Sequence, residues 1–375
     1  MLSEDQRMIQ DTARAFARER LAPQAAHRDA EARIEPELLT DLGALGFLGM
    51  TVPPEFDGAG ADYVSYALAL IEVAAGDGAV STVMSVHNAP FNAILQRYAS
   101  SEQQEAVLRP AARGEFIGAF ALTEPQAGSD ASAIATTARK TASGYVIDGA
   151  KAFITSGRIG GQCIVFARMA GTRGKDGITA FLVPTDTPGY RVERVEAKLG
   201  QKASDTCALA FEGMELPESA RIGAEGEGYR IALSSLETGR IGIAAQSVGM
   251  AQAALDMARA WAGERQSFGV PLKAHQAVAF KLAELATELE AARQLVLNAA
   301  RMKDAGVPCL TEAAMAKLYA SEAAERIVSG ALQVFGGYGY VSDTGIERIY
   351  RDVRVCQIYE GTSDIQKLII ARALA

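Results

Sequence analysis

Apolar residues recur at helical spacing through the first third of the chain. The first segment runs to Pro23, a residue that cannot continue a helix. A fifth helix is predicted to begin at Ser101, because Ser101 and Gln104 fit a capping box. Together these elements predict an N-terminal helical domain over residues 1–114. The helices predicted between the first and the fifth cover residues 36–45, 62–75 and 78–98.

The pattern changes near Gly114 to short apolar segments that are separated by glycine-rich turns. Residues 136–140 and 145–148 flank Ala-Ser-Gly, which is typical of a β-hairpin. Short strands at this regular spacing predict a small barrel or sandwich, here over residues 115–224. The other predicted strands cover residues 116–122, 164–168, 178–184, 190–195 and 207–211.

Long, alanine-rich helices follow Gly228 and are interrupted at Pro271 and Pro308. Two shorter helices are predicted after them. Long helices joined by short connections favour an antiparallel four-helix bundle, here over residues 225–375. The fold class expected for the whole chain is therefore α+β with three domains. The long helices are predicted over residues 229–262, 273–304 and 311–334.

Composition excludes several classes of protein. The net charge of -8 and the pI of about 5.2 argue against a nucleic-acid or anionic-membrane partner. The four cysteines form no CxxC pair and there are only three histidines, so no metal site is expected. The sequence shows no apolar run of about 18 residues and no signal pattern, so we expect a cytoplasmic protein without a membrane span.

The segment Ile358–Gln366 carries a carboxylate, Glu360, beside a glycine and just before a predicted helix. Ser363 and Gln366 fit a capping box, so Ser363 is expected to open that helix. A helix N-terminus suits an anion, and Glu360 would then lie on a rigid turn beside an anion site. The alternative is an ordinary helix start with an exposed glutamate.

Two segments of the β region could hold a polar ring. Phe120–Asp130 ends a strand in a loop whose amides and hydroxyls could bind a ring edge or a phosphate, or simply face solvent. Phe153 and Thr155 are two residues apart and would point the same way in a regular strand. An aromatic face with a hydroxyl donor suits a flat heterocycle, although Phe153 could instead be a core residue.

The C-terminal region offers further candidates. Glu237 and Arg240 share one helix face, either as a functional pair or as a solvated ion pair. Arg265 and Phe268 follow a helix end, and the glycine-rich turn over Gln333–Gly339 could close on a diphosphate or simply cap a helix. That turn is not GxGxxG and follows a helix, so no Rossmann site is implied.

In type, order and spacing these segments together resemble the acyl-CoA dehydrogenase family, over about Leu2 to Leu374. The segments 239–246 and 358–366 look most like the short-chain branch. The resemblance implies FAD held between the β domain and the C-terminal bundle, and oxidation of an acyl-CoA to the trans-2-enoyl-CoA.

The resemblance also assigns residues. Glu360 matches the catalytic base, because the alternative base position of the family is Gly239 here. Flavin contacts are implied for Phe120, Leu122, Thr123, Gly128, Ser129, Phe153, Ile154, Thr155, Thr362 and Asp364. Contacts to the FAD of a neighbouring subunit are implied for Arg265, Phe268, Gln276, Gln333, Val334, Gly336 and Gly337. Substrate contacts are implied for Ser129, Glu237, Arg240, Tyr359 and Gly361.

The implied partners are an acyl-CoA, electron-transferring flavoprotein as the oxidant of reduced FAD, and other copies of the chain in a homotetramer built as a dimer of dimers. The absence of an arginine around Ser81 argues against a dicarboxylyl substrate. We therefore expect a short straight acyl chain such as butyryl, with 2-methyl-branched groups second.

Two rival classes share the resemblance. A flavin oxidase or monooxygenase of this fold usually lacks the glutamate found here at position 360, and a nucleic-acid-associated relative does not fit the acidic charge. The chain also departs from the family at three positions. Phe153, Ser156 and Gln126 stand where tryptophan, asparagine and glycine are frequent.

Overall fold

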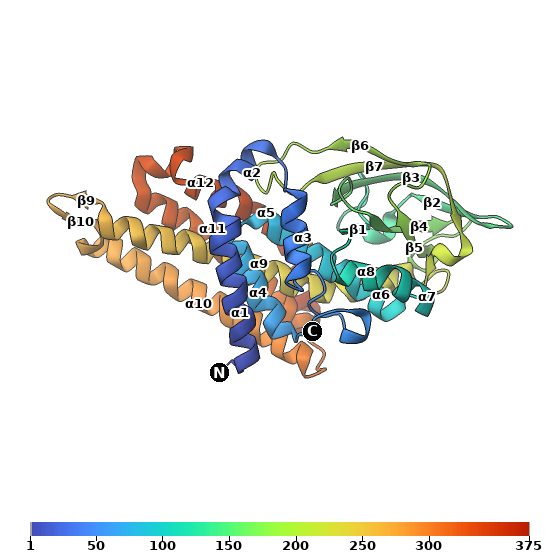
Figure 1. Cartoon of the computed structure of the whole chain (residues 1–375), viewed down its shortest axis with the longest axis horizontal. Coiled ribbons are helices and arrows are strands. Elements are labelled where there is room, and N and C mark those ends of the chain that lie inside the picture. The colour runs from blue at the N-terminus through green and yellow to red at the C-terminus, as the bar shows by residue number, and fades with distance from the viewer. Residues whose placement is uncertain (1, 375) are drawn as a thin grey trace.

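The computed structural model describes residues 2–374, and a layer of helices forms its N-terminal part (Figure 1). Almost every residue of α4 (Tyr63–Gly76) and α5 (Gly78–Val86) is buried, as expected for helices that are apolar all round. The remaining helices of this layer are α1 (Glu4–Phe16), α2 (Ala25–Glu31), α3 (Pro36–Ala44), α6 (Ala93–Tyr98), α7 (Ser101–Gln103) and α8 (Arg109–Ala112).

Two details of this layer differ from the prediction. The helix predicted over 78–98 is interrupted at Ala89, whose φ of -149° and ψ of 117° are not helical, because Pro90 follows it. The capping box before α7 uses Ser100 and Gln103, one residue earlier than predicted. Either of two adjacent serines satisfies the sequence pattern, and the structure uses the first.

The predicted β domain is confirmed, and its strands form one eight-stranded mixed sheet in the order β6-β7-β3-β2-β4-β5-β8, with β1 paired to β4. The parallel pairs are β1 with β4 and β2 with β4, along successive parts of one edge of β4. The strands are β1 (Gly118–Ala121), β2 (Thr137–Lys140), β3 (Gly144–Thr155), β4 (Gln162–Met169), β5 (Ile178–Pro184), β6 (Tyr190–Val195), β7 (Thr206–Pro217) and β8 (Arg221–Ile222).

Strand β4 is apolar on both faces because each face is covered. Ile164 and Phe166 pack with residues of the N-terminal helices, including Phe91 and Leu95. Residues of β3 and β7 pack on the opposite face, so the sheet curls over its own core. One face of the sheet therefore packs against the N-terminal helices, and the other face covers the core of the β domain itself.

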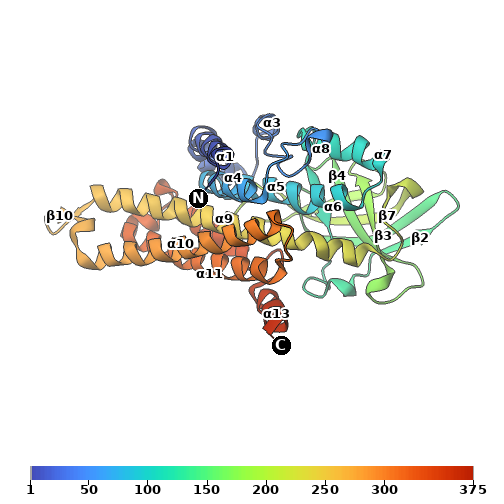
Figure 2. The same ribbon diagram turned by 90° about the horizontal axis from the view of Figure 1, so that it is seen from below.

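The three long C-terminal helices are confirmed and run antiparallel (Figures 1 and 2). The hairpin β9 (Gln266–Ser267) and β10 (Val270–Pro271) joins the first two, at the end of the molecule opposite the β domain. No described helix is long and apolar enough to cross a membrane. The helices are α9 (Gly228–Glu264), α10 (Gln276–Asp304), α11 (Leu310–Phe335), α12 (Ile346–Val353) and α13 (Ser363–Leu374).

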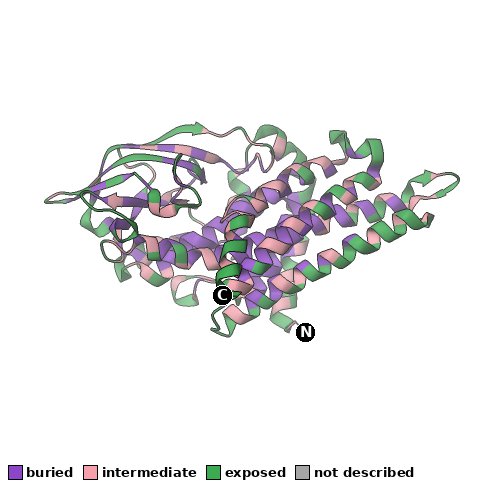
Figure 3. Cartoon of the chain, turned by 180° about the vertical axis from the view of Figure 1, so that it is seen from behind, coloured by how far each residue is buried: buried purple, intermediate pink, exposed green. Residues whose placement is uncertain are grey.

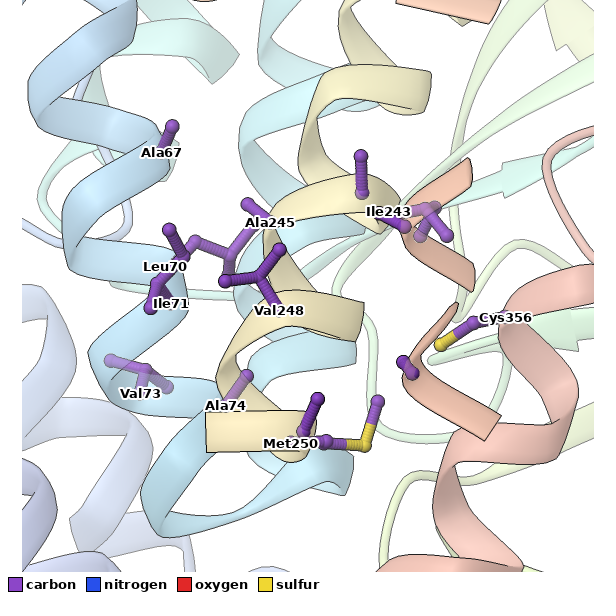
Figure 4. Packing of buried hydrophobic residues seen from close by; sticks show 14 of the residues in the cluster. Ala67, Leu70, Ile71, Val73, Ala74, Ile243, Ala245, Val248, Met250 and Cys356 are labelled. Carbon is purple, nitrogen blue, oxygen red and sulfur yellow. The ribbon is translucent and has the colours of Figure 1, made fainter. Parts of the chain in front are cut away.

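Helix α9 is the central element, because it packs on α4 as well as on its own bundle (Figure 4). Figure 3 shows buried residues on the sides where the long helices face one another. Leu70, Ile71 and Ala74 of α4 meet Ala245 and Val248 of α9 in this core. A methyl group added at Gly249 would lie 2.1 Å from the Ile71 carbonyl oxygen, so the two backbones are in close contact there.

This close approach predicts that Gly249→Ala is destabilising although alanine is the better helix former. Overpacking of this kind costs about 1–3 kcal/mol. The matched control is Gly263→Ala in the same helix, where the nearest atom to an added methyl group is Lys273 Nζ at 3.7 Å. That control should gain up to about 1 kcal/mol. Urea unfolding measures both changes, and equal gains in the two variants would contradict the packing.

Candidate active site

The segment that carries Glu360 is a tight turn between a 3-10 helical turn (Arg354–Gln357) and α13. Glu360 has a φ of 54° and Gly361 a φ of 86°, so two consecutive residues are left-handed. A non-glycine residue in this region is strained and must be held by its surroundings. Gln366 Nε2 donates to the Gly361 carbonyl at 2.8 Å and to the Glu360 carbonyl at 3.3 Å, while Lys317 Nζ donates to the Gly361 carbonyl at 2.7 Å.

Helix α13 begins at Ser363 as predicted, but the capping box predicted for Ser363 and Gln366 is wrong. Thr362 caps α13, because its Oγ1 accepts a hydrogen bond from the Ile365 N–H at 3.3 Å. The buried Oγ of Ser363 has no hydrogen-bond partner. The Gln366 side chain points back onto the Glu360–Gly361 turn, so it holds the turn and does not bond to Ser363.

The Glu360 carboxylate faces α9 at Gly239. A methyl group added at Gly239 would lie 2.8 Å from Glu360 Oε2, so a larger residue there would displace the carboxylate. Oε2 is buried and has no hydrogen-bond partner. Burial raises the pKa of Glu360 to about 7, although the positive charges of Arg240 and Lys317 oppose the rise. A buried carboxylate without a partner is suited to accept a proton.

Arg240 follows Gly239 and is itself buried, with 5 % of its surface exposed. Its Nε and Nη1 atoms have no hydrogen-bond partner, and burial lowers its pKa below the usual value. The predicted pairing of Arg240 with Glu237 is not observed. Glu237 instead pairs with Lys303, with 2.8 Å between Oε1 and Nζ.

One turn further along α9, Gly242 faces two hydroxyl groups. A methyl group added there would lie 2.6 Å from Ser85 Oγ and 3.1 Å from Tyr66 Oη. Tyr66 Oη is buried and has no hydrogen-bond partner, and burial raises its pKa well above the usual value. Gly239 and Gly242 share a helix face about 4.5 Å apart along the axis. Because glycine has no side chain, α9 presents only backbone at Gly239 and Gly242, and we call this part of the helix its bare surface. The Glu360 carboxylate faces one end of the bare surface and these hydroxyls face the other.

Tyr359 is anchored behind the turn. Its hydroxyl donates to Gln246 Oε1 at 2.9 Å, and burial raises the pKa of Tyr359 well above the usual value. Gln246 in turn donates to Ser81 Oγ at 2.7 Å and to Thr82 Oγ1 at 2.8 Å. This network ties the turn to α9 and α5, and it places Tyr359 as a support of the turn.

A pocket of about 600 Å³ opens beside Glu237, between α9 and a loop of the β domain. Four basic side chains and two acidic ones, Asp176 and Glu237, contribute to its lining. The sequence did not point to this pocket, because its cations come from four separate elements and form no motif. The basic residues are Arg97, Lys175, Arg230 and Lys303.

The two β-domain segments predicted to hold a ring lie side by side. The Ala152 N–H donates to the Thr123 carbonyl at 2.9 Å. Buried Lys151 donates to the Leu122 carbonyl at 3.0 Å and pairs with buried Glu124 at 2.7 Å. An ion pair between them thus fixes the loop after β1 against β3.

Phe153 does not occupy a regular strand position. Its φ is 59° and the β3–β7 register shifts between Lys151 and Ile154, so the predicted alternation with Thr155 is broken by a bulge. Phe153 is 66 % exposed, which also excludes a core role. An uncovered aromatic ring beside the half-buried hydroxyls of Thr123 and Thr155 fits the face of a flat heterocycle such as a flavin.

Of the other residues predicted to contact the flavin, some are buried and some are exposed. Leu122 and Ile154 are buried in the domain, and Phe120 packs edge-on against Phe166. Gly128 and Ser129 are exposed in the loop after β1. In the C-terminal region, Thr362 caps α13 and Asp364 is exposed in its first turn.

The residues expected to reach another subunit gather around the β9–β10 hairpin and the end of α11, at the end of the bundle opposite the β domain (Figure 1). The Arg265 guanidinium lies over the Tyr338 ring, and Trp261 stacks on Phe335 at the end of α11. Phe268 is 96 % exposed at the tip of the β9–β10 hairpin. Gln276, Gln333, Gly336 and Gly337 are exposed in the same region, and Val334 is half-buried.

Comparison with known proteins covers the whole chain. Family models match in order: "Acyl-CoA dehydrogenase, N-terminal domain" over residues 3–115, the middle domain over 119–214 and the C-terminal domain over 226–375. The short-chain specific acyl-CoA dehydrogenase of Bos taurus mitochondria is 45 % identical over 99 % of this chain and 90 % of its own length.

Solved structures agree. Butyryl-CoA dehydrogenase from Megasphaera elsdenii is 38 % identical with a TM-score of 0.98, over 100 % of this chain and 99 % of that one. A glutaryl-CoA dehydrogenase from Mycobacterium smegmatis in complex with FADH2 is 34 % identical with a TM-score of 0.95, over 100 % and 95 %. The chain therefore belongs to the acyl-CoA dehydrogenase family of FAD-dependent oxidoreductases.

Proposed function

We propose that the protein oxidises a short-chain acyl-CoA to the trans-2-enoyl-CoA, with Glu360 as the base that removes the α-proton. The observation that carries this proposal is the buried Glu360 Oε2 atom, which has no hydrogen-bond partner and lies against Gly239. The identity to short-chain and butyryl-CoA dehydrogenases supports the substrate class.

The α-proton of a thioester is a very weak acid, so the base and the surroundings must both help to remove it. A carboxylate whose pKa is raised to about 7 is a stronger base than an exposed one. Hydrogen bonds to the thioester oxygen stabilise the negative charge that develops there, and each such donor contributes about 2.7–4 kcal/mol in comparable sites. The Glu360 N–H is the donor that the chain itself would supply.

FAD fits the β-domain face described above. Phe153, Thr155, Thr123 and Ser129 are the residues that would hold its ring system, and the Lys151–Glu124 pair keeps their two segments together. When bound, FAD supplies the acceptor for the hydride that leaves the β-carbon. The ring would also exclude water from Glu360, which strengthens the charges that act there.

The pocket beside Glu237 fits the charged end of coenzyme A. Its phosphates would bind the positive charges of Arg97, Lys175, Arg230 and Lys303. Helix α9 connects this pocket to the Glu360 carboxylate, because it carries both Arg230 and Gly239. Glu237 and Lys303, which form an ion pair, are both part of that lining, and Glu237 lies two residues before Gly239 in α9. The acyl end would then lie on the bare surface of α9 between Gly239 and Gly242.

We also propose that reduced FAD passes its electrons to electron-transferring flavoprotein and that the protein is a homotetramer. The resemblance to the family supports both. The exposed aromatic residues at the far end of the bundle, Phe268 at 96 % and Tyr340 at 90 %, support a contact between subunits there. A 2-methyl-branched acyl group is the second candidate substrate.

Glu360→Gln is expected to retain FAD and to bind butyryl-CoA, but to lose turnover by roughly three orders of magnitude or more, because the amide cannot accept the proton. A dye-linked assay measures turnover, and the visible spectrum of bound flavin reports cofactor retention. Near-normal turnover in this variant would remove Glu360 from the role of base.

The reaction should also depend on pH in one direction. Glu360 must be ionised to act, so kcat/KM for butyryl-CoA should rise with pH and level off above about pH 7. Below that pH it should fall about tenfold per unit. The charged and titratable groups that face Glu360 are Arg240, Lys317 and Tyr66. A profile that is flat between about pH 5.5 and 8 would contradict the assignment.

Tyr66 and Ser85 should limit the length of the acyl chain, because they occupy the end of the α9 surface opposite Glu360. Each extra buried methylene contributes about 0.8 kcal/mol, so Tyr66→Ala should raise the octanoyl-to-butyryl ratio of kcat/KM by roughly tenfold or more. The matched control, Tyr66→Phe, keeps the ring and should leave the ratio unchanged. An unchanged ratio in Tyr66→Ala would place the limit elsewhere.

A further inference from the structure

Lys317 on α11 is fully buried, and the proposed reaction gives it no task. Among the described residues, the one hydrogen bond of its side chain runs from Nζ to the Gly361 carbonyl at 2.7 Å. The other fully buried lysine, Lys151, has a carboxylate partner at 2.7 Å, but no carboxylate of the described residues lies within ion-pair distance of Lys317. Burial of an unpaired ammonium costs several kcal/mol, so the fold retains this charge against a penalty.

The groups around Lys317 show where its charge acts. Glu360 directly precedes the residue whose carbonyl Lys317 binds, and the positive charges of Lys317 on α11 and of Arg240 on α9 both act on its carboxylate. Cys356 and Glu322 are the other titratable groups that face Lys317, and Tyr66 of α4 faces Glu360. Two cations therefore act on one buried carboxylate from two different helices.

We propose that Lys317 is a positioning residue for the base: its ammonium holds the Glu360–Gly361 turn and supplies a positive charge beside the Glu360 carboxylate. The proposal rests on the assignment of Glu360 as base. Gln366 also binds the Gly361 carbonyl, at 2.8 Å, so a neutral donor is already present to hold the turn. What Lys317 alone adds is the charge.

The positive charge of Lys317 lowers the pKa of Glu360. An adjacent cation favours the ionised carboxylate, whereas burial favours the protonated form. Without Lys317, the effect of burial would be less opposed, the pKa of Glu360 would rise further, and the carboxylate would be mostly protonated at neutral pH. The lysine therefore keeps the carboxylate available for proton removal in a site from which water is excluded.

The test compares Lys317→Met, which removes charge and donor, with Lys317→Gln, which removes the charge but keeps a donor. Both variants should shift the acid limb of the kcat/KM profile for butyryl-CoA to higher pH by about one unit. Activity should be about fivefold lower at pH 7, about tenfold lower at pH 6 and close to wild type at about pH 9. Lys317→Arg retains a charge and should restore the wild-type profile. Ser321→Ala, a buried change one turn along the same helix, should leave the profile unchanged.

A second readout does not need turnover. Infrared difference spectra against Glu360→Gln report the carboxyl stretch of Glu360 as pH is varied, and its midpoint should rise in both neutral variants. If that midpoint and the kinetic profile both stay in place, Lys317 is only a packing residue and the proposal is wrong. If neither neutral variant folds, the lysine serves folding, which also overturns the proposal. If Glu360→Gln is active while the infrared midpoint still shifts, the base assignment fails and the electrostatic coupling stands.

Discussion

The structure depends on one carboxylate that is buried against a helix without a hydrogen-bond partner. Burial of Glu360 disfavours its charged form, which raises its pKa to about 7 and suits it to accept a proton. The chain holds the residue in place with a strained turn, a glutamine and a lysine that bind the turn's carbonyls, and a glycine that leaves room for the carboxylate. The left-handed turn and the buried charges are destabilising alone, whereas the hydrogen bonds to the turn are favourable, and together these features position one carboxylate.

Helix α9 connects this carboxylate to the rest of the molecule. Gly249 allows α9 to pack closely on α4, and Gly239 and Gly242 leave a bare surface between Glu360 and the hydroxyls of Tyr66 and Ser85. Earlier in the same helix, Arg230 and Glu237 line the charged pocket. A single rigid element therefore sets the distances between the groups proposed for the coenzyme A end, the reacting carbons and the acyl end.

Periodicity and motif order were sufficient to predict the succession of helical, β and helical parts, because those signals extend over many residues. Local details failed where two neighbours satisfy the same pattern. Ser100 caps a helix in place of Ser101, since both serines have a glutamine three residues on and fit a capping box. Thr362 caps α13 in place of Ser363 by a single bond from the Ile365 N–H, which needs no glutamine. The bulge at Phe153 also escaped prediction, because strand alternation assumes a regular backbone.

Contacts between residues far apart in the chain could not be predicted from the sequence. Glu237 pairs with Lys303 of the next long helix and not with Arg240 of its own helix, and only the packing of the two helices decides between them. Lys317 and Tyr66 give no motif, because each is a single polar residue at a buried position of a helix. The unpaired charge and the unpaired hydroxyl that define their roles became visible only when their neighbours were known.

The central claim is that Glu360 removes a proton from the carbon next to the thioester. Acetyl-CoA tests it most directly, because it has α-hydrogens but no β-carbon and so cannot be oxidised. Incubation of the FAD-loaded protein with acetyl-CoA in D2O, followed by mass spectrometry, measures α-hydrogen exchange alone. The account predicts deuterium incorporation with the wild-type protein and none above background with Glu360→Gln. Equal incorporation with both proteins would contradict it.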